Sequence, residues 1–97
     1  MLFRSALKPD DGPALHLLGN WYARRGADGL AVRMLSEAAG QGERVSNLLM
    51  ARCFTSLQSW DEARRAYERA RTTSEATVEY VELCLTALSE AERRSRN

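Results

Sequence analysis

Apolar residues recur along the first half of the chain at intervals of three and four, the spacing that places them on one face of an α-helix. The first such face contains Leu15, Leu18, Gly19 and Tyr22, and the next contains Ala31, Leu35 and Ala38. The same intervals return 32 residues later, at Asn47, Met50, Ala51 and Phe54 and then at Ala63, Tyr67 and Ala70. Self-similarity at a fixed period indicates a repeat architecture, so we predict a helical repeat protein.

Turn-forming and capping residues divide this pattern into separate helices. We predict helices over residues 13–25, 28–39, 43–57, 60–71 and 75–93, with a partial helix over 2–8 and a frayed tail over 94–97. The predicted N-caps are Asp11, Asp28, Ser59 and Ser74, and Ser59 with Glu62 has the spacing of a capping box. No stretch has the alternation typical of a strand. The predicted fold class is all-α, with short loops that fold consecutive helices into antiparallel hairpins.

The length of 97 residues predicts a single domain over residues 1–97. Within it we expect a first repeat over 12–43, a second over 44–75 and a terminal helix over 76–93. That terminal helix is apolar on nearly all sides. One of its faces carries Tyr80, Cys84, Ala87 and Ala91, and another carries Val78, Val81, Leu85 and Leu88.

Composition and charge exclude several classes of function. The chain has 14 Lys and Arg against 13 Asp and Glu, a formal net charge of +1, whereas a protein that grips phosphate backbones is usually clearly basic. We therefore expect no nucleic acid partner. No apolar run approaches the ~18 residues that span a membrane, and the N-terminal apolar stretch is too short for a signal peptide. A soluble, cytoplasmic protein is expected.

The residues that could carry chemistry are scattered. His16 is the only histidine, and Cys53 and Cys84 form no C-x-x-C pair, so neither a metal site nor a disulfide scaffold is predicted. The chain has no glycine-rich phosphate loop, no nucleophile elbow and no H-E-x-x-H motif. Its acidic residues are spread over predicted solvent faces. We expect no enzyme activity and no cofactor.

Arginines crowd the fourth predicted helix and the C-terminal end of the fifth. They are Arg64, Arg65, Arg69 and Arg71, followed by Arg93, Arg94 and Arg96. Acidic residues share the fourth helix, and spacing suggests pairs such as Asp61–Arg65 and Glu62–Arg69. We interpret this cluster as a solvated outer face of the helix rather than as a nucleic acid or lipid site.

The repeated pattern resembles the signature of the tetratricopeptide repeat (TPR) family. Its first copy reads Leu15-x-x-Leu18-Gly19-x-x-Tyr22 and then Ala31-x-x-x-Leu35-x-x-Ala38, and its second reads Met50-Ala51-x-x-Phe54 and then Ala63-x-x-x-Tyr67-x-x-Ala70. Residues 3–10 resemble the end of a preceding repeat, and Tyr80, Leu83, Cys84 and Ala87 the start of a following one. The chain departs from the family in its 32-residue period, against the usual ~34. Leu15 and Asn47 also stand where Trp is typical, and the closing Pro is absent from both full repeats.

The resemblance implies a short right-handed solenoid whose concave groove binds an extended or helical segment of a protein partner. Groove positions on the first helix would be His16, Asn20, Ala23 and Arg24. Those on the third would be Leu48, Leu49, Arg52, Thr55 and Ser56. Those on the fifth would be Val78, Val81, Glu82 and Leu85. Leu48, Leu49, Val81 and Leu85 favour an apolar or amphipathic ligand.

Some members of this family hold the C-terminal carboxylate of heat-shock chaperones with a clamp of Lys, Asn and Arg. Asn20 matches one clamp position, but His16 stands at a Lys position and Leu49 at the second Asn position. Val78 and Glu82 replace the last two cations. We therefore predict that the chain does not bind such a carboxylate.

Three alternatives remain open from the sequence. The chain is a peptide-binding interaction module, a small dedicated chaperone for a bacterial client such as a secretion-apparatus subunit, or a segment of a larger TPR protein. The predicted half repeats at its two ends would leave apolar faces uncapped. One way to cover them is a homo-oligomer in which the fifth helix contacts residues 2–8 of another copy head to tail.

Overall fold

The computed structural model describes residues 11–96, and all of the regular secondary structure in this range is helical, which confirms the all-α class. The helices are α2 (Gly12–Arg24), α3 (Asp28–Gly40), α4 (Asn47–Ser56), α5 (Trp60–Thr72) and α6 (Val78–Arg96). The partial helix predicted over residues 2–8 lies outside the described residues. The predicted bounds of α2, α3 and α5 agree with the structure to within one residue.

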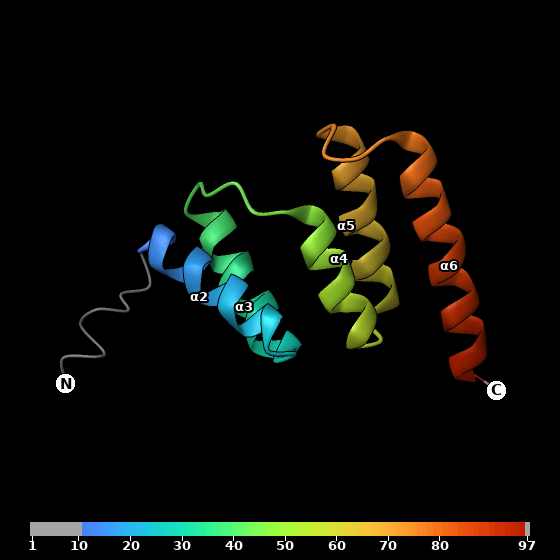
Figure 1. Cartoon of the computed structure of the whole chain (residues 1–97), viewed down its shortest axis with the longest axis horizontal. Coiled ribbons are helices and arrows are strands. Elements are labelled where there is room, and N and C mark those ends of the chain that lie inside the picture. Colours follow the sequence, from blue (N-terminus) through green and yellow to red (C-terminus); the bar gives the residue numbers. More distant parts are fainter. Residues whose placement is uncertain (1–10, 97) are drawn as a thin grey trace. The chain divides into compact units, whose positions relative to one another are not determined.

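The chain divides between Val45 and Ser46 into two compact units. This boundary lies within two residues of the one predicted between the two repeats. In unit 1, α2 packs against α3 as a helical hairpin, and in unit 2, α5 packs against α4 and against α6 (Figure 1). A single solenoid running through both units stays a prediction.

The core of unit 1 depends on a close approach of its two helices. Leu35 and Ala31 of α3 are fully buried, and Leu15 of α2 is 5% exposed. A Cβ atom added to Gly19 would lie 2.6 Å from Cγ and Cδ2 of Leu35. Gly19 therefore occurs within α2, despite its low helix propensity, because the Leu35 side chain occupies the space beside it.

The core of unit 2 is built mainly on α5. Its buried residues are Ala63, Ala66, Tyr67 and Ala70, together with Met50, Ala51 and Cys53 of α4 and Val81 and Leu88 of α6. The predicted inner positions of α5 are thereby confirmed. The structure also decides between the two apolar faces of α6, because it buries Val81 and Leu88 and leaves Tyr80 and Leu83 exposed.

Four helices end in the same way, at intervals of 16 residues. The residues with a positive φ are Gly26, Gly42, Gln58 and Ser74. In each case the next residue donates its backbone N–H to the carbonyl five positions back, as in the bond from Ala27 to Tyr22 at 3.0 Å. This is the Schellman motif, which satisfies carbonyls left unpaired at a helix C-terminus. Two such intervals make the 32-residue period of the sequence.

The predictions for the starts of α4 and α6 were wrong by four and three residues. Residues 43–46 are not helical, because the Glu43 N–H is used by the Schellman motif after α3 and the Ser46 hydroxyl caps α4 by accepting the Leu49 N–H at 3.1 Å. Similarly, the Glu75 N–H bonds to the Ala70 carbonyl, and the Thr77 hydroxyl accepts the Tyr80 N–H at 3.1 Å. Ser74 is therefore not an N-cap.

Other predicted helix ends also need correction. Asp11 caps α2 as predicted, accepting the Ala14 N–H at 3.2 Å, but Asp28 is the first residue of α3 rather than its cap. Ser59 is the N-cap of α5, yet its side chain makes no capping hydrogen bond, so the capping box does not form. The tail predicted to fray from residue 94 is helical to Arg96, supported by the Arg96–Glu92 ion pair at 2.8 Å.

Candidate interaction surfaces

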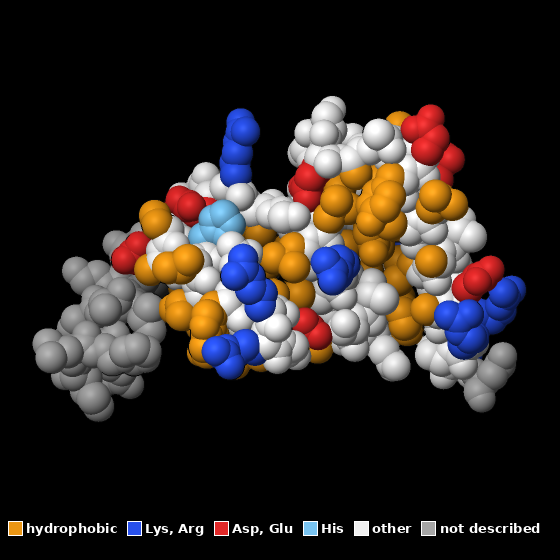
Figure 2. Space-filling view, viewed as in Figure 1, with side chains coloured by type: hydrophobic (Ala, Val, Ile, Leu, Met, Phe, Trp, Pro, Cys, Tyr) orange, Lys and Arg blue, Asp and Glu red, His pale blue; other side chains and the backbone are white. Residues whose placement is uncertain are grey.

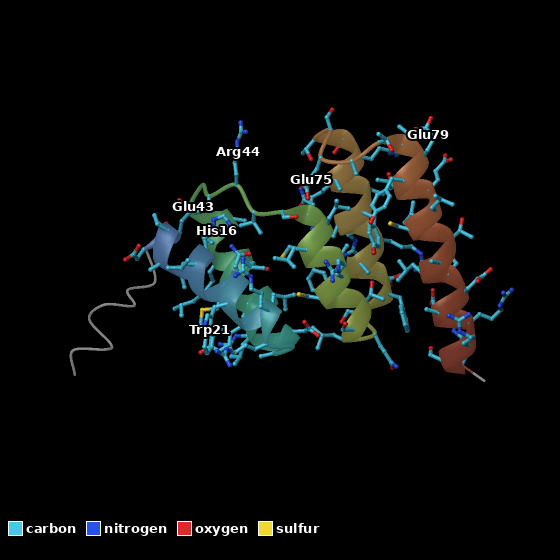
Figure 3. All side chains as sticks on the ribbon, viewed as in Figure 1. His16, Trp21, Glu43, Arg44, Glu75 and Glu79 are labelled. Carbon is cyan, nitrogen blue, oxygen red and sulfur yellow. The ribbon has the colours of Figure 1, made fainter. Side chains whose placement is uncertain are left out.

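In unit 1, the predicted groove positions lie on the accessible side of α2. His16, Asn20 and Ala23 are partly exposed, and Arg24 is exposed. The His16 Nδ1 atom lies 3.3 Å from Oε1 of Glu43, which follows α3 (Figure 3). Gly12 leaves the room for this approach, since a Cβ atom there would lie 3.0 Å from Glu43 Cγ. Glu43 was not singled out from the sequence, because its contact with His16 spans 27 residues.

Unit 1 also exposes large apolar residues that the repeat pattern does not mark. Leu17 is 73% exposed, Trp21 48% and Leu30 41%. The Arg25 guanidinium lies 4.2 Å from the Trp21 ring centroid, and the Tyr22 ring meets the Trp21 ring edge-on with centroids 5.2 Å apart. Trp21 is thus partly covered by a cation–π contact. One feature of the sequence indicated this exposure: these residues alternate along the chain with the positions predicted to face inward.

In unit 2, the predicted groove positions of α4 cover one continuous side of that helix. We call this the α4 face: Leu48, Leu49, Arg52, Thr55 and Ser56. Arg52 and Ser56 are exposed and the other three are partly exposed, whereas Met50 and Ala51 on other sides of the helix are buried. In the view of Figure 2, hydrophobic side chains gather over α5 between α4 and α6. The α4 face therefore borders an apolar surface.

Tyr67 of α5 joins α4 to α6 on this side of unit 2. Thr55 of α4 and Cys84 of α6 are both neighbours of its side chain. Burial raises the pKa of Tyr67, the neighbouring Cys84 adds to the rise, and the hydrogen bond with Thr55 opposes it. Thr55 was a predicted groove residue, whereas Cys84 was not. The two cysteines of the chain form no disulfide.

The N-terminal end of α4 is occupied by the carboxylate of Glu75 (Figure 3). Its Oε1 accepts the Ser46 hydroxyl at 2.7 Å and the Leu48 N–H at 2.9 Å, and its Oε2 accepts the Asn47 N–H at 2.9 Å. Burial raises the pKa of Glu75, but these hydrogen bonds and one from the Asn47 amide outweigh it and lower the pKa overall. A carboxylate at a helix N-terminus also interacts favourably with the helix dipole.

A hollow of about 530 Å³ lies between α5 and α6, and α4 contributes nothing to it. It is lined by Arg64, Arg65, Glu68, Arg69 and Leu85. Leu85, a predicted groove position, borders the arginine-rich side of α5 here. Two arginines of α5 form ion pairs, Arg64 with Glu92 and with Asp61, and Arg71 with Glu68, and Arg69 donates a hydrogen bond to Asn47. We had predicted an Asp61–Arg65 pair, but Asp61 pairs with Arg64.

The remaining predicted positions on α6 separate into buried and exposed residues. Val81 is fully buried, so its side chain belongs to the core of unit 2 and not to an accessible surface. Val78 is 48% exposed, and Glu82 is exposed. The most exposed large apolar residues of the helix, Tyr80 at 52% and Leu83 at 71%, lie outside the predicted groove set.

Comparisons of the chain with protein-family models, with curated proteins and with solved structures find no match. Within residues 11–96, no group of three or more His, Cys, Asp or Glu side chains is arranged to hold a metal ion. No helix in the described part of the chain is long and apolar enough to cross a membrane. The surfaces above are therefore the basis for a functional assignment.

Proposed function

We propose that this protein is a non-catalytic interaction module of the tetratricopeptide type, acting in the cytoplasm, which binds an extended or helical segment of a partner protein. The α4 face is the observation that carries this proposal. It presents Leu48 and Leu49 beside the exposed Arg52 on a helix whose other sides are packed within the protein. The recurrence of Schellman motifs every 16 residues supports a helix-pair repeat.

The chemistry of the α4 face suits an amphipathic helical ligand. Apolar side chains of the ligand would contact Leu48 and Leu49, while an acidic residue at its edge would pair with Arg52. The N-terminal end of α4 offers no free amides for a ligand carboxylate, because Glu75 already accepts those of Asn47 and Leu48. That the chain does not bind a C-terminal carboxylate in the manner of a chaperone clamp stays a prediction.

The test is an affinity capture that compares wild-type protein with the double variant Leu48→Asp, Arg52→Glu. We expect recovery of the specific partner to fall at least tenfold, because the variant places one carboxylate among the apolar contacts and another where a cation stood. The matched control is Leu17→Asp, Arg33→Glu, which makes the same two kinds of change at exposed positions of α2 and α3. Circular dichroism would verify that both variants are folded.

Equal recovery with the α4-face variant and with wild type would show that this face is not the binding site. Equal loss with both double variants would also count against it, because the effect would then follow from charge alone. Once the partner is identified, calorimetric titration of its binding segment gives the affinity directly.

A further inference from the structure

Helix α6 carries two apolar stripes, and the described residues 11–96 cover only one of them. Val81 and Leu88 face inward, at 0% and 2% exposure. A second stripe, which we call the outer stripe, consists of Tyr80, Leu83, Ala87 and Ala91. Tyr80, Leu83 and Ala87 are exposed, and Ala91 is partly exposed. A single exposed leucine is ordinary, but aligned apolar residues on one helix face indicate an interaction surface.

The spacing of the outer stripe is that of a helix–helix contact. Its residues follow one another at intervals of three, four and four, and Arg94 continues the line three residues later. Such intervals keep side chains on one face and allow two helices to pack along their lengths. The 19 residues of α6 extend for about 28 Å, long enough for several turns of contact.

Charge along α6 is divided between its two ends. The first half exposes Glu79 and Glu82, and no Lys or Arg occurs between residues 74 and 89. The second half exposes Arg93, Arg94 and Arg96. Of the two acids in this half, Glu92 is paired with Arg64 of α5 and with Arg96, and Glu90 lies 4.0 Å from the Arg94 guanidinium, at the outer limit of an ion pair. The helix is therefore acidic near its start and basic near its end.

We propose that the outer stripe is covered by a second copy of this chain, whose α6 packs antiparallel to that of the first. An alignment centred on Ala87 places Leu83 of each copy opposite Ala91 of the other, and Tyr80 opposite Arg94. Glu79 of each copy then lies beside Arg94 of the other. The contact is isologous, since both copies use the same residues. It lies on a different surface from the α4 face.

Charge and size select this arrangement over a parallel one. Parallel packing would set Glu79 against Glu79 and Arg94 against Arg94, which is unfavourable. In the antiparallel pair, Glu79 of each copy lies beside Arg94 of the other, so both of these contacts join opposite charges. The Arg94 guanidinium also meets the Tyr80 ring of the other copy as a cation–π partner. Ala87 at the crossing point is small enough for the helices to approach to about 8 Å.

A contact of one helix pair is small, so the dimer is weak. Stable protein interfaces bury at least about 1,200 Å² in total, and a single pair of helices falls short of this. We therefore expect a dimer that forms with rising concentration and weakens with rising salt, since salt screens its charge pairs.

Sedimentation equilibrium of the full chain over a wide concentration range tests the proposal. Wild type should rise from the monomer mass of 10.9 kDa toward twice that value. Leu83→Asp should stay monomeric, whereas Leu17→Asp, at an equally exposed leucine of unit 1, should dimerise like wild type. A wild type that stays monomeric at every concentration, or a Leu83→Asp variant that dimerises normally, would overturn the proposal.

Two further variants test the direction of packing. Glu79→Arg should weaken the dimer at least tenfold, and adding Arg94→Glu should restore it, because the double exchange re-forms the opposite-charge pair only in an antiparallel dimer. Ala87→Cys should form a disulfide-linked dimer on mild oxidation, whereas Ser89→Cys, on another side of α6, should not. Failure of both results would exclude this arrangement. If Phe3→Asp abolished the dimer while Ala87→Cys failed to cross-link, residues 2–8 of the second copy would be the occupant instead.

Discussion

Gly19 is the residue on which the contact between α2 and α3 depends. Glycine in a helix interior costs about 1 kcal/mol relative to alanine. The Leu35 side chain, which is fully buried, fills the space that a Cβ atom at position 19 would need. Here the cost in helix propensity is offset by close packing of the two helices.

We predict that Gly19→Ala destabilises the protein by about 1–3 kcal/mol, because overpacking outweighs the gain in helix propensity. Urea denaturation would measure the change. The matched control is Gly29→Ala in α3, where an added Cβ meets nothing within 4 Å and should be neutral or stabilising. If both substitutions stabilised the protein, the close approach at Gly19 would be refuted.

At the scale of elements, the Glu75 carboxylate ties the loop after α5 to the start of α4. It caps a helix that begins 28 residues earlier and accepts bonds from two backbone amides and two side chains. Asn47 in turn accepts a hydrogen bond from Arg69 Nε at 3.2 Å, which adds a contact between α4 and α5. These polar contacts fix the position at which α4 begins.

We predict that Glu75→Gln lowers the free energy of unfolding at neutral pH by about 0.5–1 kcal/mol, the lower part of the range for a helix cap because the residue is exposed. Folding lowers the pKa of Glu75 below its ordinary value of 4.5, so its contribution is present above that value. The contribution is lost as the pH falls through the folded-state pKa. Urea unfolding from pH 7 to pH 3 should show wild type and variant converging.

The control for this pH dependence is Glu37→Gln, at an exposed position of α3. It should lie parallel to wild type across the same range. A constant difference between wild type and Glu75→Gln at all pH values would show that the carboxylate charge does not contribute to the cap.

Which elements could be predicted from the sequence depends on where their determinants lie. The ends of α2 and α3 were predicted closely, because Gly26 and Gly42 are local signals that favour a positive φ. The start of α4 was missed because it depends on Glu75, whose partners are 27 to 29 residues away. The start of α6 was missed although its contacts are local, because we assigned the N-cap to Ser74 rather than to Thr77. The choice between the stripes of α6 was also beyond the sequence, since Val81 and Tyr80 are both compatible with burial.

The candidate site was predictable in part for the same reason. The α4 face follows from the spacing within one helix, so its members share one side of α4 in the structure. A groove that combines positions from several helices cannot be predicted in this way, because the exposure of each position depends on how the helices pack. Val81 is in the core and Leu85 lines a hollow with arginines of α5. The partner of His16, Glu43, follows α3 and gave no local signal.

At the scale of the whole molecule, the two compact units differ in how many described helices support each core. In unit 2, α5 has a neighbour on each of two sides, and Ala63, Ala66 and Ala70 are fully buried. In unit 1, α2 and α3 support each other. Local opening is easiest where fewest buried contacts are lost.

We therefore predict that backbone amides of α5 exchange with deuterium more slowly than those of any other helix. Those of α2 and α3 should exchange faster, through opening of unit 1 on its own. Hydrogen exchange followed by NMR would resolve the individual amides. Equal protection of α3 and α5 would instead indicate that the two units open together as one cooperative body.

The four Schellman turns determine how the fold responds to the insertion or deletion of a residue. An extra residue within α3 would rotate the rest of that helix by about 100° and misalign its buried side. The error would stop there, because α4 takes its phase from Ser46 and Glu75 rather than from the end of α3. The effect of an insertion or deletion is thus confined to the 16-residue segment in which it occurs. The pattern of buried residues in the following segments is unchanged.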